Sequence, residues 1–184
     1  MSPRFGEPSW SYTGRQFERD FVGSITQDRA YQEALQKVAT PDGFVRFDAA
    51  LRLVRAHQPW DPTNPDADLL RDLRLEIIDQ LHLREQDADR VRAYTAVGSP
   101  LDIFHGIDAF IEYQDQKTEN VRRITLDLTL KEHKDADQRK ANILIRELPA
   151  PEEDTYLQAV TRYAKEAMRF LQPSARHEHP PRRP

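Results

Sequence analysis

Asp127 stands in a segment where an acidic side chain is unexpected. Residues 122–131 alternate between apolar and polar positions, and the apolar ones are Ile124, Leu126, Leu128 and Leu130. This alternation predicts a β-strand with one apolar face, and aspartate disfavours strands. Thr129 and Lys131 fall on the polar face beside Asp127. A lysine in such a position can stabilise a phosphate or position a water molecule.

Asp108 is a second carboxylate in a predicted strand, residues 106–113, where Ile107, Ala109 and Ile111 take the opposite face. If this strand pairs with residues 122–131 through the polar turn at residues 114–120, a register that brings Asp108 near Asp127 is within reach. Two adjacent carboxylates repel each other unless a cation offsets their charge. Mg²⁺ or Mn²⁺ does so and binds oxygen ligands of this kind, so we expect both aspartates to hold a divalent ion.

Glu76 is the candidate third carboxylate at the metal, where it would orient a water molecule or a second ion. It lies along the leucine face of the helix expected at residues 66–83, and glutamate is rarely buried without a partner. Glu18 is the rival, because it shares a helix face with Phe21, Val22 and Ile25. We prefer Glu76 because its helix immediately precedes the first predicted strand.

Each of these residues also has a structural interpretation. Asp127 would pair with basic side chains in an ion network, and the candidates for that network are Arg122, Lys131 and Lys140. Asp108 would cap a turn after Gly106, and Glu76 would pair with an arginine such as Arg84. His105 is the one histidine near Asp108, and a residue of this kind is more often a loop histidine.

The pattern of the chain predicts helices first and strands afterwards. Expected helices cover residues 13–38, 44–56, 66–83 and 152–171, and expected strands cover residues 91–97, 106–113, 122–131 and 141–148. This order predicts an arm with a helical extension (residues 1–65), a core (66–172) and a disordered tail (173–184) rich in proline and charge. There is no P-loop, dinucleotide fingerprint or G-x-S-x-G motif.

Composition narrows the class of protein. The 184 residues suit one domain, and the formal net charge is −4. Residues 117–146 nevertheless carry an excess of basic side chains, which can steer a polyanion or simply form a solvated hairpin. The chain has no cysteine, so disulfides, thiolate metal sites and cysteine nucleophiles are excluded. We expect no membrane segment, no secretory signal and a cytoplasmic location.

The helix glutamate, the strand containing Gly106 and Asp108, and the segment Asp127, Thr129, Lys131 together resemble the PD-(D/E)XK nuclease superfamily. The similar segments are DLRLEIIDQL, VRAYTAVGSPLD, HGIDAFIEYQ and RRITLDLTLK, within residues 70–148. The resemblance implies an α/β (α+β) fold with a restriction-endonuclease-like αβββαβ core and a mixed central sheet. It also implies metal-dependent hydrolysis of phosphodiester bonds.

On this resemblance Asp108 corresponds to the first metal-binding aspartate, Asp127 to the acidic residue of (D/E)XK, and Glu76 to the helix glutamate. Thr129 stands where the lysine of the family belongs, so Lys131 or Lys140 would face the scissile phosphate. The implied partner is nucleic acid, with DNA expected. The alternative is a nuclease-like fold without catalysis that binds a protein or nucleic acid, with a homodimer or a protein partner meeting the N-terminal helices.

Overall fold

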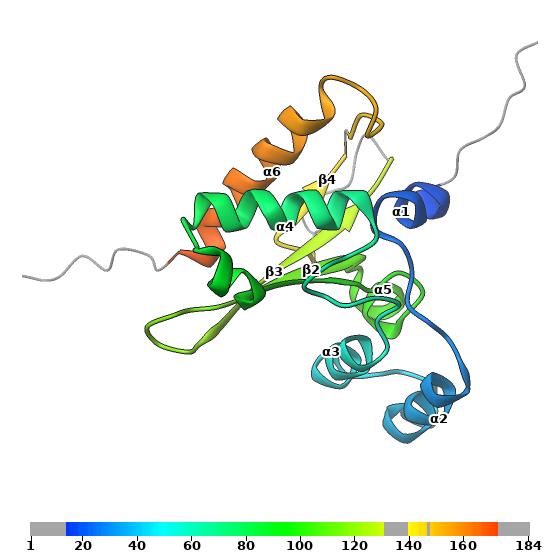
Figure 1. The fold of residues 1–184 in the computed structure, drawn as a ribbon. Coiled ribbons are helices and arrows are strands. Elements are labelled where there is room, and N and C mark those ends of the chain that lie inside the picture. Colours follow the sequence, from blue (N-terminus) through cyan, green and yellow to red (C-terminus); the bar gives the residue numbers. More distant parts are fainter. Residues whose placement is uncertain (1–13, 131–139, 147, 173–184) are drawn as a thin grey trace, which may run out of the picture.

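The fold is built around one four-stranded mixed sheet. The computed structural model describes residues 14–130, 140–146 and 148–172. The strands are β1 (Val91–Thr95), β2 (Ala109–Gln114), β3 (Val121–Leu128) and β4 (Ile143–Ile145), and they lie in the order β1-β2-β3-β4 (Figure 1). The first three strands form an antiparallel meander, and β4 is parallel to β3.

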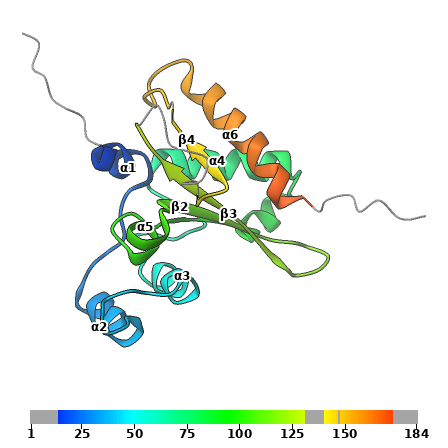
Figure 2. The same cartoon turned by 180° about the vertical axis from the view of Figure 1, so that it is seen from behind.

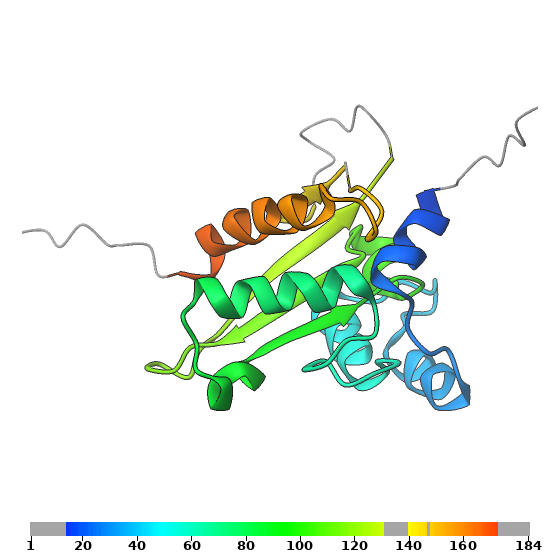
Figure 3. The ribbon, with the colours of Figure 1, turned by 45° about the horizontal axis from the view of Figure 1, so that its top comes forward.

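Helices cover both faces of the sheet. On one face lie α4 (Asp68–Gln80) and α6 (Tyr156–Leu171), which pack against each other across the strands (Figure 3). On the other face lie α3 (Phe47–Ala56) and α5 (Pro100–His105), with α2 (Arg29–Val38) outside them (Figure 2). At one end of the sheet α1 (Gly14–Val22) contacts α4 and β3.

The alternation in β3 accounts for this layering. Ile124, Leu126 and Leu128 are buried in the cluster that joins α4 and α6 to the sheet. Their neighbours Thr125 and Asp127 are buried as well, although they point to the other face. β3 is therefore a strand with two buried faces, one apolar and one polar.

The predicted fold class is confirmed at the level of a mixed α/β protein with a four-stranded mixed sheet. All four predicted strands are present with shifted bounds, and the predicted helices near residues 44–56, 66–83 and 152–171 correspond to α3, α4 and α6. The single helix expected at residues 13–38 is wrong. It divides into α1 and α2 because Gly23 adopts a left-handed conformation (φ 68°) and Asp28 caps a new helix by accepting from Tyr31 N–H.

Two short helices were not expected. The six-residue α5 lies between β1 and β2, where Ser99 accepts from Leu101 N–H as its N-cap and Gly106 ends it with φ 61°. A 3₁₀ turn, η1 (Glu85–Arg90), precedes β1. Both are shorter than the window over which helical periodicity is detectable.

Two of the N-terminal helices, α1 and α3, are packed against the sheet. Phe17, Phe21 and Val22 of α1 belong to the same buried cluster as α4, α6 and the strands, and α3 joins a second cluster with Tyr94 and Phe110. The expected arm and tail fall mostly outside the described residues. No helix in the described part of the chain has the length and apolarity of a membrane span.

Candidate carboxylate site

Asp108 lies at the point where β2 begins, beside the end of β3. Its backbone N–H donates to Leu126 O (2.9 Å), and its Oδ2 accepts from Leu128 N–H (2.7 Å). Asp108 therefore bonds to the residues on either side of Asp127. The register pairs Ala109 with Leu126, so Asp108 and Asp127 are the next residues along the two strands. Both side chains are almost fully buried, with 4% and 5% of their surface exposed.

Two further carboxylates approach this pair from helices. Glu18 of α1 and Asp102 of α5 lie close enough for their charges to act on Asp108. Asp102 is held by α5, where its Oδ2 accepts from Gly98 N–H (2.9 Å). We call Glu18, Asp102, Asp108 and Asp127 the carboxylate cluster. Its members come from a helix, a short helix, a strand start and a strand end, and they converge at one end of the sheet.

The electrostatics of the cluster favour a proton or a cation. Burial raises the pKa of Asp108 to about 8, and the charges of Glu18, Asp102 and Asp127 add to the rise, although the hydrogen bond from Leu128 N–H opposes it. Burial also raises the pKa of Asp102, where Gly98 N–H and the guanidinium of Arg15 oppose the shift. Negative charge is thus costly at this point of the fold.

The predicted third carboxylate, Glu76, is not brought to the pair. It lies on α4, whose buried side chains pack on the apolar face of the sheet, and its Oε1 accepts from Gln80 Nε2 (2.9 Å). The rival Glu18 is the helix glutamate that reaches Asp108. Its position depends on α1 being packed at the end of the sheet by Phe17 and Phe21, which helical periodicity alone does not reveal.

The two candidate amines for the phosphate are those of Lys131 and Lys140. Lys131 lies outside the described residues. Lys140 is exposed, its Nζ donates to Phe104 O (3.1 Å), and its stem passes Gly106. Phe104 belongs to the last turn of α5, where backbone carbonyls attract cations. Lys140 therefore lies at the end of α5, beside the turn that leads to Asp108, with its amine on a carbonyl. Thr129, at the lysine position of the family, is buried.

His105 has a structural role. Its ring nitrogen Nε2 bonds Val45 O (2.9 Å), and its ring packs against Phe44 and Phe47. It ties α5 to α3 and is not directed at the carboxylates by any described contact.

A divalent ion fits the donor set of the cluster. Mg²⁺ is commonly held by one or two carboxylates, with water and substrate phosphate completing its shell. Asp108 and Asp127 offer such a pair, and the raised pKa of Asp108 marks a place where added positive charge is favourable. Among the described residues no three His, Asp or Glu side chains are already arranged as a metal-binding group. A bound ion would therefore rely on the two aspartates, water and substrate.

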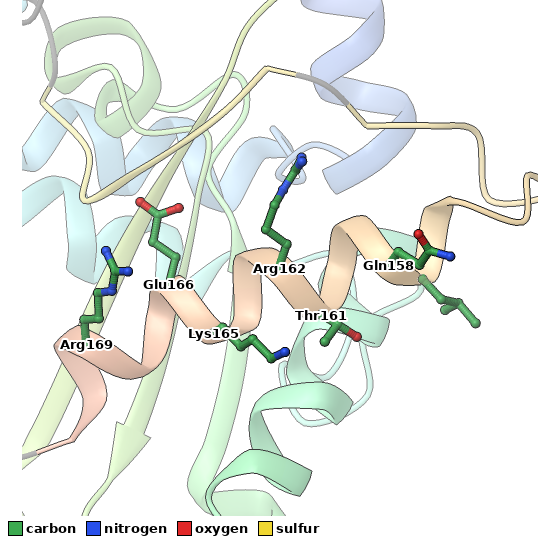
Figure 4. Close-up of a pocket in the computed structure, with 7 residues that line it drawn as sticks. Gln158, Thr161, Arg162, Lys165, Glu166 and Arg169 are labelled. Carbon is green, nitrogen blue, oxygen red and sulfur yellow. The ribbon is translucent and has the colours of Figure 1, made fainter.

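A second surface feature lies away from the cluster. A hollow of about 760 Å³ runs over the outer side of α6. Figure 4 shows Arg162, Glu166 and Arg169 on one side of that helix and Thr161 and Lys165 on the other. Because α6 covers the apolar face of the sheet, this basic surface is separated from the carboxylates by the sheet itself.

Comparisons with models of protein families, with curated proteins and with solved structures found no match to this chain.

Proposed function

We propose that this chain is a divalent-metal-dependent nuclease whose active site is the carboxylate cluster. The observation that carries the proposal is the position of buried Asp108 at the end of β3, where it is bonded to both neighbours of Asp127 and the charges of three other carboxylates act on it. Burying several carboxylates of like charge costs free energy, so such groups are kept mainly where function needs them. Strongly perturbed groups of this kind gather at active sites.

The residues have distinct roles in this proposal. Asp108 and Asp127 hold the ion, and the hydrogen bond from Leu128 N–H fixes the orientation of the Asp108 carboxylate. Glu18 takes the role that the sequence assigned to Glu76, which is to orient a water molecule at the metal. When bound, Mg²⁺ or Mn²⁺ supplies charge neutralisation for the phosphate and activation of water. Arg15, whose charge acts on Asp102, and Lys140, at the end of α5, can attract the phosphates of the substrate.

The proposal retains the PD-(D/E)XK resemblance as its structural frame. What supports this frame is the mixed sheet, in which three antiparallel strands precede a parallel β4. The crossover between β3 and β4 contains residues 131–139, which lie outside the described part. Lys131 remains the candidate amine for the scissile phosphate, because Lys140 bonds Phe104 O.

Cleavage assays test the proposal directly. Purified protein is incubated with single- and double-stranded DNA and RNA, in Mg²⁺, in Mn²⁺ and in a chelator. We expect metal-dependent cleavage of at least one substrate, lost in Asp127→Asn and kept in Asp79→Asn, which alters an exposed aspartate on α4. Protein that cleaves none of the substrates and binds no divalent ion by calorimetry would contradict the nuclease proposal.

The second candidate is a nuclease-like fold that binds a partner without catalysis. Two observations favour it: Thr129 occupies the lysine position, and the amine of Lys140 is bonded to Phe104 O. On this interpretation the carboxylates are structural and N-terminal helices meet the partner. The two candidates differ in the effect of Asp108→Asn on metal-free protein. Loss of a structural carboxylate lowers the free energy of unfolding, whereas relief of crowded metal ligands raises it.

A further inference from the structure

A neutral groove borders the carboxylate cluster on the outer side of α5. It has a volume of about 420 Å³ and lies between α2 and α5. Its apolar walls are formed by Tyr31, Leu35, Ala39, Pro100, Ile103 and Phe104. Ile103 is 63% exposed, which is unusual for a large apolar side chain beside a recessed surface.

Three amide side chains edge this groove. Gln27, Gln32 and Gln36 line it, and none of its described lining residues carries a charge. A primary amide offers both donors and an acceptor, so it matches the hydrogen-bonding edge of a nucleobase. An apolar wall with a polar edge is how unstacked bases are held in single-stranded nucleic acids.

The groove and the carboxylate cluster share a structural element. Gly98 donates its N–H to Asp102 Oδ2 (2.9 Å) and accepts from Gln27 Nε2 at its carbonyl (2.6 Å). Asp102 and Ile103 are consecutive residues of α5, so the helix presents a carboxylate to the cluster and an apolar side chain to the groove. A polynucleotide whose phosphate lies at the cluster would therefore have a base within reach of the groove.

We propose that the groove between α2 and α5 holds one nucleobase of a single polynucleotide strand whose phosphate lies at the carboxylate cluster. This proposal rests on the proposed nuclease function and adds the form of the substrate. A base in the groove must be unstacked, so the strand enters single-stranded or with a base turned out of a duplex. The absence of charge among the described lining residues favours a base over a phosphate.

The test compares the binding of two fluorescein-labelled 12-mers. One is oligothymidylate, and the other has the same backbone with abasic residues. Both are measured in Ca²⁺. We expect the wild-type chain to bind the thymidylate strand about tenfold more tightly, because stacking of one base has about this effect. Ile103→Asn and Gln32→Ala should each reduce this preference severalfold. Leu157→Asn is the matched control, because Leu157 is an equally exposed apolar residue (65%) on α6.

The outcomes separate this proposal from the nuclease proposal. Equal affinity for the two strands, or a preference that Ile103→Asn leaves unchanged, would overturn the base pocket and leave the groove to a peptide partner. Cleavage without a base preference would leave the nuclease intact and refute the pocket. A base preference lost in Ile103→Asn, in a protein that never cleaves, would support the pocket and refute the nuclease. Failure to bind either strand would overturn the base pocket, and the cleavage assay on duplex substrates would then decide the nuclease proposal by itself.

Discussion

Two buried carboxylates, Glu112 within β2 and Asp108 just before it, have different surroundings. Glu112 accepts from two guanidinium groups, Arg55 Nη2 at 2.5 Å and Arg123 Nε at 2.6 Å. Asp108, just before the strand, accepts from one backbone N–H and has three carboxylates as neighbours. Both residues are buried. Within five residues the chain thus carries one carboxylate that is neutralised by guanidinium groups and one that is not neutralised by any described contact.

The difference indicates which carboxylate is structural. A fold that only needs to bury an acid surrounds it with donors, as α3 and β3 do for Glu112. Asp108 instead has the charges of Glu18, Asp102 and Asp127 acting on it, and no basic side chain is among the described influences on its carboxyl group. An arrangement of this kind is expected where a cation from solution completes the site.

The largest stability effect is expected at Glu112. Glu112→Gln leaves Arg55 and Arg123 facing each other without a carboxylate, and should lower the free energy of unfolding by about 2–3 kcal/mol. This is less than the loss for a fully buried pair, because both guanidiniums reach solvent. Urea denaturation at pH 7 measures it, with Glu33→Gln, at an exposed pair with Arg29, as the control. A loss below about 0.5 kcal/mol would show that the Glu112 network is not structural.

Asp108→Asn should act in the opposite direction. The pKa of Asp108 is raised from 3.8 to about 8, so the folded chain binds a proton that the unfolded chain releases between these values. The stability contributed by this proton is complete below pH 3.8 and is lost as the pH rises towards 8. The slope is at most about 1.4 kcal/mol per pH unit.

Denaturation at pH 5.5, 6.5 and 7.5 in a chelator measures this effect. The asparagine amide oxygen can still accept from Leu128 N–H, so the variant should keep its fold. Because asparagine does not titrate, the free energy of unfolding of the variant should depend less on pH. At pH 7.5 we expect it to be more stable than the wild type by about 1–2 kcal/mol. A variant less stable than the wild type at pH 7.5 would assign Asp108 the same structural role as Glu112.

Divalent cations should bind at the carboxylate cluster and not at the Glu112 network. Mg²⁺ at about ten times its dissociation constant adds about 1.4 kcal/mol to the stability of a chain that binds it only when folded. We expect the melting temperature of the wild type and of Glu112→Gln to rise with Mg²⁺, and that of Asp127→Asn to stay constant. Equal shifts in all three proteins would place the ion outside the carboxylate cluster.

Lys140→Ala should have the smallest effect. Its amine is exposed and bonds one carbonyl at the end of α5, so its loss should change stability by less than about 0.5 kcal/mol. Cleavage should fall by less than about tenfold, because the amine is held by a carbonyl at the end of α5. A loss of activity as complete as in Asp127→Asn would instead make Lys140 the amine that faces the phosphate.

The sequence predicts the strand architecture better than the helices at its edges. Alternation in residues 122–131 identifies β3 because one face of that strand packs in an apolar environment and the other in a polar one. The break between α1 and α2 depends on Gly23, whose Cβ-free backbone lies against Trp60, a contact between residues far apart in the chain. The helix α5 begins at the Ser99 cap and ends at Gly106, and its six residues carry too little periodicity to predict a helix.

The candidate site, like the fold, is predicted by the sequence only in part. The nearness of Asp108 and Asp127 follows from pairing two strands through a short turn, which the sequence shows. The choice between Glu76 and Glu18 depends on which helix reaches the polar end of the sheet. Both glutamates lie on amphipathic helices, so only tertiary packing distinguishes them. Asp102 is missed because α5 is not predicted, although Ser99-Pro100 and Gly106 are the start and stop signals of a short helix.

A crystal of the full chain soaked in Mn²⁺ tests the cation site most directly. We predict an anomalous peak at the end of β3 with oxygens of Asp108 and Asp127 about 2.1–2.2 Å from the ion. The peak should be lost in crystals of Asp127→Asn and kept in crystals of Asp79→Asn. Well-ordered wild-type crystals with no peak at this position, or with the two carboxylates directed away from each other, would contradict the proposed site.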